Sequence, residues 1–273
     1  MPLKMCKLPI MSTAGFLLIG LLAATSAKAA TGSFKFEPYD ASKEVDVELM
    51  LAVDISQSMD TEEQEIQRAG YVAALTSSEF LDAIKLGSIG RIAVAYMEWG
   101  GVEEQFIVAN WTVIQDAQSA AAFAGQISEA PLRQVQRTSI ASALRKSVEL
   151  IQTNQYTGLR QVIDISGDGP NNQGGSVTEA RDQMLATGVT INGLPLMMKA
   201  DQGSWQALLH LDYYYEDCVI GGPGSFAIPV KSKGSFADAI RMKLVMEVAN
   251  LTFEHPLVHR VAAREPVRCS LFD

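Results

Sequence analysis

The stretch that decides the fold is "VDVELMLAVDISQSMDTEEQ", residues 45–64. Its first residues alternate between apolar and polar, and the later ones are apolar at every position, which is typical of a strand covered on both faces of a parallel sheet. The strand ends at Asp54, and Ser56 and Ser58 follow at intervals of two residues. Acidic residues then crowd the predicted first turn of a helix, where the helix dipole favours them. A carboxylate and two hydroxyls therefore meet where a strand gives way to a helix.

The same alternation between strand and helix periodicity continues along the chain. Further strands are expected at 91–99, 104–111, 160–166, 189–197 and 226–230, and helices at 61–86, 118–127, 139–152, 176–187 and 235–249. A hairpin around "GGVE", residues 100–103, makes one edge pairing antiparallel. The pattern predicts one α/β domain of three layers, Rossmann-like, with a mostly parallel sheet and helices on both faces.

The two ends of the chain do not follow this pattern. Residues 1–29 have a lysine-bearing leader, an apolar stretch and small residues at the A-x-A spacing, which together indicate a cleaved secretory signal peptide. The apolar stretch is shorter than the roughly 20 residues that a membrane span needs, so we expect no membrane insertion after cleavage. Residues 30–44 are expected to form an N-terminal arm, residues 45–250 the domain, and residues 251–273 a C-terminal tail.

Charge and cysteine content limit the partners and the compartment. The net charge of −9 becomes −12 without residues 1–29, because that segment holds three lysines and no acid. Such a chain repels phosphate backbones, so nucleic acid is not an expected partner. The expected location is the periplasm or the exterior of the cell, where Cys218 and Cys269 can form a disulfide. Two reduced and buried thiols are the alternative.

Oxygen-bearing side chains recur near the predicted carboxyl ends of the strands, where open α/β sheets bind their ligands. Asp54, Ser56 and Ser58 follow the first strand, Thr138 precedes the helix at 139–152, and Asp168 follows the strand at 160–166. Carboxylate and hydroxyl oxygens suit Mg²⁺, with Mn²⁺ or Ca²⁺ as alternatives, rather than softer metals. Ser58 and Thr138 can equally well be helix caps, and "GDGPNN", residues 167–172, an ordinary turn.

These residues resemble the motif of the von Willebrand factor type A domain. D-x-S-x-S after the first strand, a threonine before a helix and an aspartate after the fourth parallel strand match the metal-ion-dependent adhesion site of that family. The resemblance extends over about 200 residues and includes the order of strands and helices. The whole chain also resembles a group of bacterial exported proteins that have one such domain and no settled function.

The resemblance implies a binding function without catalysis. In the family, the hydroxyls of Ser56, Ser58 and Thr138 would contact the cation, and Asp54 and Asp168 would act largely through bound water. The ion then keeps one position for an Asp or Glu side chain of a protein partner. Some members of the family also shift their C-terminal helix, which here is the segment 235–249.

Two other classes of function remain open from the sequence. A phosphatase of the haloacid dehalogenase type also has an aspartate after its first strand, which here would be Asp54. Its chemistry needs a second acid two residues later as general acid, and Ser56 occupies that position. The second alternative is an exported structural domain that binds no metal.

Overall fold

The computed structural model describes residues 40–198, 210–249 and 264–272. The strands are β1 (Glu44–Asp54), β2 (Ile92–Trp99), β3 (Gln105–Ile114), β4 (Thr157–Gly167) and β5 (Thr190–Pro195). The helices are α1 (Thr61–Leu75), α2 (Ser78–Lys85), α3 (Ala117–Glu129), α4 (Ile140–Thr153), α5 (Val177–Leu185), α6 (Leu211–Tyr214) and α7 (Phe236–Ala249). Short turns of other helix types are η1 (Ala41–Lys43), η2 (Tyr215–Val219, a π-helix), η3 (Lys233–Ser235) and η4 (Cys269–Leu271). The predicted signal peptide and most of both predicted arms lie outside the described residues.

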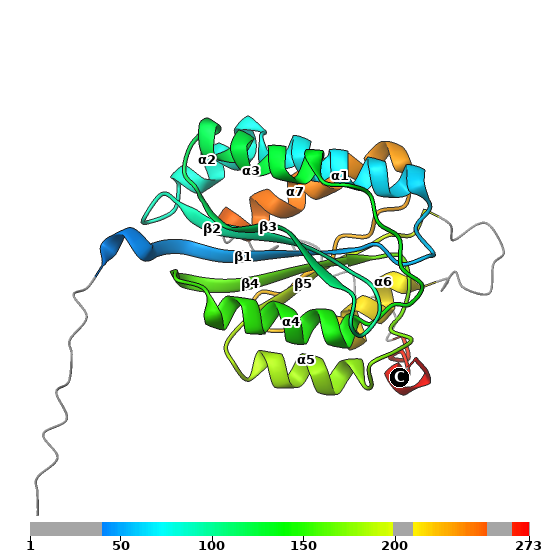
Figure 1. Ribbon diagram of the computed structural model, residues 1–273. Coiled ribbons are helices and arrows are strands. Elements are labelled where there is room, and N and C mark those ends of the chain that lie inside the picture. Colours follow the sequence, from blue (N-terminus) through cyan, green and yellow to red (C-terminus); the bar gives the residue numbers. More distant parts are fainter. Residues whose placement is uncertain (1–39, 199–209, 250–263, 273) are drawn as a thin grey trace, which may run out of the picture. The chain divides into compact units, whose positions relative to one another are not determined.

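The five strands form one sheet in the order β3-β2-β1-β4-β5 (Figure 1). β1 pairs in parallel with β2 and with β4, β4 pairs in parallel with β5, and β3 is the antiparallel edge strand. This arrangement confirms the predicted α/β fold with a mostly parallel sheet and one antiparallel edge. Because β1 lies at the centre of the sheet, Asp54 leaves the sheet between the ends of its two neighbours.

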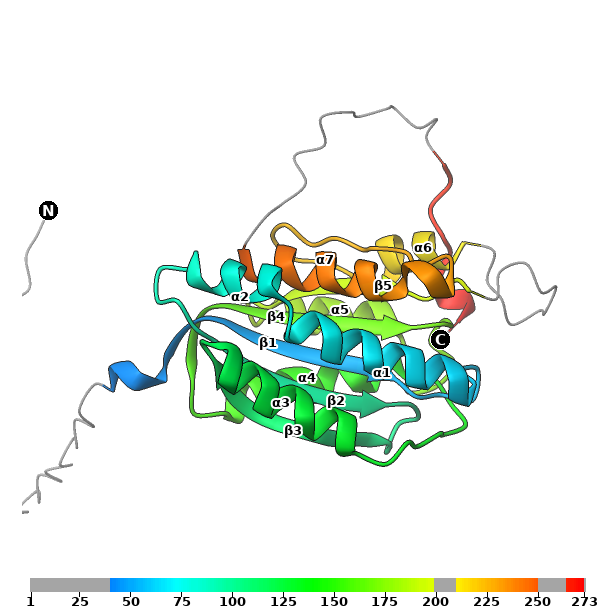
Figure 2. The ribbon, with the colours of Figure 1, turned by 90° about the horizontal axis from the view of Figure 1, so that it is seen from above.

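Two hydrophobic layers enclose the sheet, one on each face. Alternate residues of β1 divide between them, so that Leu49 and Leu51 pack under α1, α3 and α7, and Met50 and Ala52 pack against α4. Figure 2 looks onto the face covered by α1, α2, α3 and α7. In the described part of the chain, no helix has both the length and the apolar character that a membrane span requires.

Three details differ from the sequence-based expectation. The helix predicted at 61–86 is two helices, because the Ser77 side chain accepts from the Phe80 N–H and starts α2 afresh. The strand predicted at 226–230 forms only isolated bridges to β5, since Pro229 has no N–H to give to a regular ladder. Tyr215 lies in a helical segment, α6 with η2, which is absent from the predicted series of strands and helices.

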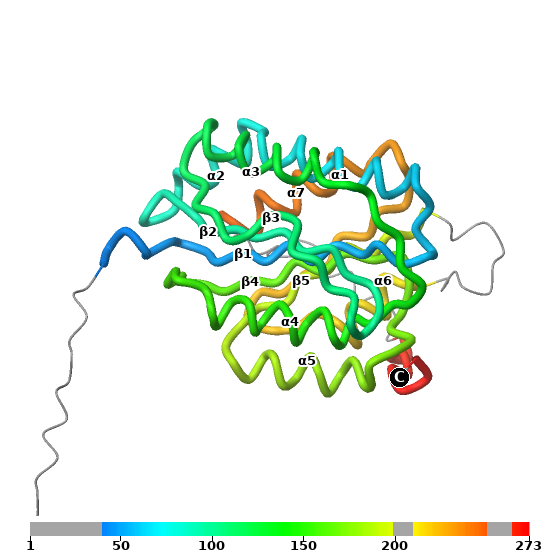
Figure 3. The backbone as a smooth tube through the Cα atoms, viewed as in Figure 1, coloured from blue at the N-terminus to red at the C-terminus, as the bar shows by residue number. Residues whose placement is uncertain are grey.

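The C-terminal segment packs against η2. Cys218 and Cys269 are joined by a disulfide, which is the first of the two alternatives for this pair. Arg264 forms ion pairs with Glu216 and Asp217, at 2.8 and 2.6 Å. These contacts tie residues 264–272 to the end of the sheet at which the predicted site residues lie, as the backbone trace in Figure 3 shows.

A buried ionic cluster joins β4 to α7. The Lys243 ammonium lies 2.6 Å from Oδ1 of Asp164 and 2.5 Å from Oε1 of Glu247, and all three side chains are excluded from solvent. Asp164, which lies within a buried strand, thus finds its partner on the helix that covers that strand. Burial raises the pKa of Glu247 to about 7, and the negative charge of Asp164 contributes to the rise.

We predict that replacing both cysteines with serine lowers the free energy of unfolding. The bond closes a loop with a sequence separation of 51, and loss of such a cross-link costs about 4 kcal/mol in the chain-entropy model. Urea unfolding without reductant measures the difference between the double variant and the wild type. Equal stability of the two proteins would contradict the prediction.

We also predict a pH-dependent effect of Glu247→Gln. A carboxyl group whose pKa is raised on folding makes the folded state lose stability as the pH rises, here between the usual value of 4.5 and about 7. As the pH rises across that window, the free energy of unfolding of the variant should therefore increase by about 1–3 kcal/mol relative to that of the wild type. Urea unfolding at pH 5, 6 and 7 tests this, with the exposed Glu149→Gln as control. A gap between variant and wild type that does not change with pH would refute it.

Candidate metal centre

Asp54 is the last residue of β1, and its side chain is completely buried. Its Oδ1 accepts a hydrogen bond of 2.7 Å from the backbone N–H of Ser56, so the chain curls back on itself as it leaves the sheet. Its other oxygen, Oδ2, is buried and has no hydrogen-bond partner among the described residues. The turn therefore fixes one oxygen of this carboxylate and leaves the other without a partner in the described part of the chain.

The two serines connect this turn to the loop after β4. The hydroxyls of Ser56 and Ser58 lie 3.0 Å apart, and the Ser58 hydroxyl donates to Oδ1 of Asp168 at 2.5 Å. Residues 110 positions apart in the sequence thus meet through a direct contact. The structure brings four of the five predicted metal ligands into one cluster of oxygen atoms at the carboxyl ends of β1 and β4.

Thr138 is held beside this cluster by Asn172. The Asn172 side chain accepts from the Thr138 N–H at 3.0 Å, and the Asn172 N–H donates to the Thr138 carbonyl at 2.8 Å. The segment before Thr138 also runs along the first turn, because the Val135 N–H donates to the Ile55 carbonyl at 3.0 Å. Ser139, and not Thr138, caps α4, so the alternative role of Thr138 as a helix cap does not apply.

The asparagines of "GDGPNN" do more than shape a turn. Asn171 is fully buried, its side chain accepts from the Ala141 N–H at the start of α4, and its own N–H donates to the Tyr214 hydroxyl. Together with the pair of bonds from Asn172, these contacts fix the Asp168 loop against the Thr138 segment. The sequence offers no signal for this role beyond two adjacent asparagines in a segment rich in turn-forming residues.

The electrostatics of the cluster favour a cation. Burial raises the pKa of Asp54 to about 8, and the negative charge of Asp168 contributes to the rise. Two carboxylates close together in a buried setting repel each other unless a proton or a positive ion lies between them. The unpartnered Oδ2 of Asp54 and the neighbouring hydroxyls offer oxygen donors to such an ion. The residues present therefore fit a hard divalent cation.

The composition of the cluster restricts the kind of metal. In the described ranges, no three His, Cys, Asp or Glu side chains come together as a metal site. Any ion held here would depend on hydroxyls, which carry no charge, in addition to the two aspartates.

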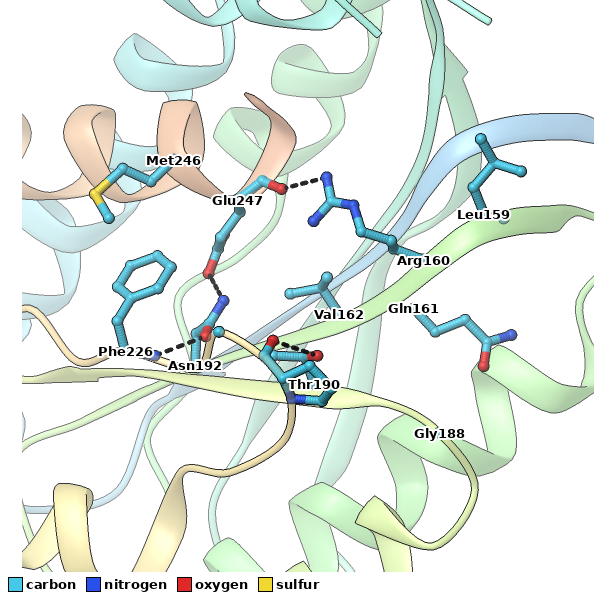
Figure 4. Close-up of a pocket in the computed structure, with 13 residues that line it drawn as sticks. Leu159, Arg160, Gln161, Val162, Gly188, Thr190, Asn192, Phe226, Met246 and Glu247 are labelled. Atoms are coloured by element: carbon cyan, nitrogen blue, oxygen red, sulfur yellow. Dashed lines mark hydrogen bonds between the residues drawn. The ribbon is translucent and has the colours of Figure 1, made fainter. Parts of the chain in front are cut away.

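A separate cavity of about 560 Å³ lies at the opposite ends of β4 and β5, beside the last turn of α7 (Figure 4). In it, the Glu247 carboxylate accepts from the Asn192 amide at 3.1 Å, and the Arg160 guanidinium donates to the Glu247 carbonyl at 2.8 Å. None of the five predicted metal ligands lines this cavity. The candidate centre and the cavity are therefore distinct features at opposite ends of the sheet.

Comparison with solved structures assigns the fold to the von Willebrand factor type A class. The chain is similar to proximal thread matrix protein 1 from the mussel byssus, with 12% identity, a TM-score of 0.54 and coverage of 76% of this chain and 48% of that one. It is similar to the pilus adhesin SpaC from Lactobacillus rhamnosus GG, with 14% identity, a TM-score of 0.54 and coverage of 76% and 30%. It is also similar to the von Willebrand domain of the type V pilus tip protein Mfa5 from Porphyromonas gingivalis, with 10% identity, a TM-score of 0.52 and coverage of 82% of this chain and 98% of that one.

These likenesses establish the fold, and the family follows from the sequence. The chain spans about half of the mussel protein and less than a third of the pilus adhesin. No curated protein matches its sequence. A family model described as "Protein of unknown function (DUF1194)" matches residues 44–252, which is most of the chain. The protein belongs to this family.

The two nearby carboxylates generate a prediction for the protein without metal. Because the pKa of Asp54 is raised on folding, metal-free stability should fall as the pH rises from about 4 toward about 8. Asp168→Asn removes one cause of the raised pKa of Asp54 and keeps an acceptor for Ser58. The free energy of unfolding of the variant should therefore fall by roughly 1 kcal/mol less than that of the wild type over the same pH range. Thermal unfolding in EDTA at pH 5 and pH 8 compares the two proteins. An equal fall in both would contradict the prediction.

Proposed function

We propose that this protein is an exported protein-binding domain that works through a divalent cation. Asp54, Ser56, Ser58, Thr138 and Asp168 would hold the ion, and an Asp or Glu side chain of a protein partner would complete its coordination. The observation that carries the proposal is the contact of Ser58 with Asp168 beside the buried and unpartnered Oδ2 of Asp54. This contact joins the loop after β1 to the loop after β4 through oxygen-bearing side chains, which are the ligands that a hard cation prefers.

The comparisons support the proposal in two respects. The similar structures include two pilus proteins, one of them called an adhesin. Another structure of the mussel protein, with 12% identity and a TM-score of 0.51, is described as having a zinc-occupied metal-ion-dependent adhesion site. For this chain we propose Mg²⁺, because hydroxyls and carboxylates are harder ligands than zinc usually takes. Mn²⁺ and Ca²⁺ are the other candidates.

Other contacts within the protein hold the proposed ligands in position. Asp54 is held by the Ser56 N–H so that its carboxylate is already in place before an ion arrives. The Asn172 bonds keep Thr138 next to the Asp168 loop. When bound, the cation would supply a partly unneutralised positive charge, and a partner carboxylate gains most from such a charge where water is excluded. We further propose that residues 1–29 direct export and that residues 45–250 form the binding domain.

Isothermal titration with Mg²⁺, Mn²⁺ and Ca²⁺ tests cation binding. We expect one site in the wild type and a loss of affinity of at least about tenfold in Ser56→Ala, because a hydroxyl that contacts the ion is removed. Ser147→Ala is the matched control, since Ser147 is an equally buried serine whose hydroxyl bonds within α4. The absence of binding of all three cations to the wild type would overturn the proposal.

Capture from a native envelope extract tests the acidic partner. The immobilised protein in Mg²⁺ should retain a partner that EDTA releases and that the Ser56→Ala protein does not retain. Coupling the carboxyl groups of the extract to a neutral amine beforehand should abolish capture. A partner that stays bound in EDTA, or after its carboxyl groups are blocked, would contradict the proposed mode of binding.

A further inference from the structure

Tyr215 extends to the candidate metal centre, where its hydroxyl lies near Asp54. It is the first residue of the π-helical turn η2, a type of turn that is frequent at functional sites, and it is completely buried. Its ring lies against β5 at Gly193, where a Cβ atom would come within 2.6 Å of the ring atom Cδ1. The missing side chain of Gly193 therefore makes room for the ring on the surface of the sheet.

A second glycine makes room for the hydroxyl. A Cβ atom on Gly167, the last residue of β4, would lie 2.8 Å from Oδ2 of Asp54 and 2.9 Å from the hydroxyl oxygen of Tyr215. Both oxygens therefore lie around the same small space, on the α4 face of the sheet. The register places Gly193 opposite Ile165, two residues before Gly167, so the ring runs along the sheet toward Asp54.

Hydrogen bonding in the described part of the protein leaves both oxygens available. Oδ2 of Asp54 and the hydroxyl oxygen of Tyr215 are both buried, and neither has a hydrogen-bond partner there. Burial raises the pKa of Tyr215 well above its usual value, and the negative charge of Asp54 adds to the effect. A phenol hydroxyl can donate a hydrogen bond and a carboxylate oxygen can accept one, so the two groups are chemically complementary.

The surroundings of Tyr215 hold it in this place. Its neighbour Tyr214 accepts from the Asn171 N–H at 3.1 Å and packs edge-on against Phe272, with ring centroids 5.2 Å apart. The disulfide of Cys218, three residues further on, fastens η2 to the C-terminal segment. A residue fixed on so many sides keeps its orientation, which a group that must meet a carboxylate requires.

We infer that Tyr215 is a positioning residue of the metal centre, whose hydroxyl donates a hydrogen bond to Oδ2 of Asp54 when the cation is bound. The inference rests on the proposed function. A hydrogen bond to a carboxylate favours its ionised form, which is the form that a cation needs. Tyr215 would thus be a sixth residue of the centre, contributed by a segment outside the five-residue motif.

Magnesium titration of single variants tests this inference. Tyr215→Phe removes only the hydroxyl and should weaken Mg²⁺ binding about tenfold, as expected for a lost bond to a buried charged group. Tyr71→Phe is the matched control, because the Tyr71 hydroxyl is also buried and unpartnered in the described residues but belongs to α1 on the other face. The control should change the affinity less than twofold. Gly167→Ala, which places a methyl group between the two oxygens, should weaken binding as Tyr215→Phe does.

A spectroscopic readout separates a positioning role from a general loss of structure. Addition of Mg²⁺ should change the tyrosine band of the near-ultraviolet circular dichroism spectrum in the wild type and in Tyr71→Phe, but not in Tyr215→Phe. Wild-type affinity in Tyr215→Phe, or an equal loss in Tyr71→Phe, would overturn this inference and leave the metal centre standing. A wild-type protein that binds no cation would overturn the proposed function, and this inference with it.

Discussion

Burial of the Asp54 carboxylate at the end of β1 is the constraint on which this end of the sheet depends. A charge in that position is costly unless hydrogen bonds or an opposite charge compensate it. The protein supplies the N–H of Ser56 for one oxygen and leaves the other unpartnered in the described residues. Asp168 adds a second negative charge nearby. The two carboxylates repel each other at this position, and under our proposal a cation relieves that repulsion.

A second group of buried acids lies on the other face of the sheet and has a cation of the protein beside it. There the Lys243 ammonium lies between the Asp164 and Glu247 carboxylates, so a cation of the protein itself contacts both acids. The cluster around Lys243 joins α7 to β4, whereas the cluster around Asp54 awaits an external ion under our proposal.

Most of the fold was predictable, because the strand and helix periods are clear over long stretches. The structure differs from the prediction where a single residue interrupts an element that the apolar pattern would continue. Ser77 restarts a helix that the apolar pattern continues, and Pro229 reduces a strand to isolated bridges. All five candidate ligands were predicted to lie at one edge of the sheet, and hydrogen bonds connect four of them there, because these four follow strands that end at that edge. Thr138 also lies at this edge, but its attachment through Asn172 was not predictable.

The sequence by itself determined the class of the fold and the positions of the oxygen donors, because both follow from short-range patterns of apolar and polar residues. Only the tertiary structure decided which groups surround Asp54. Tyr215 comes from η2, a segment 161 residues further along the chain, and reaches Asp54 because Gly193 and Gly167 leave space on two adjacent strands. The alignment of these residues depends on the strand register, and register is a property of paired strands that no single stretch of sequence contains.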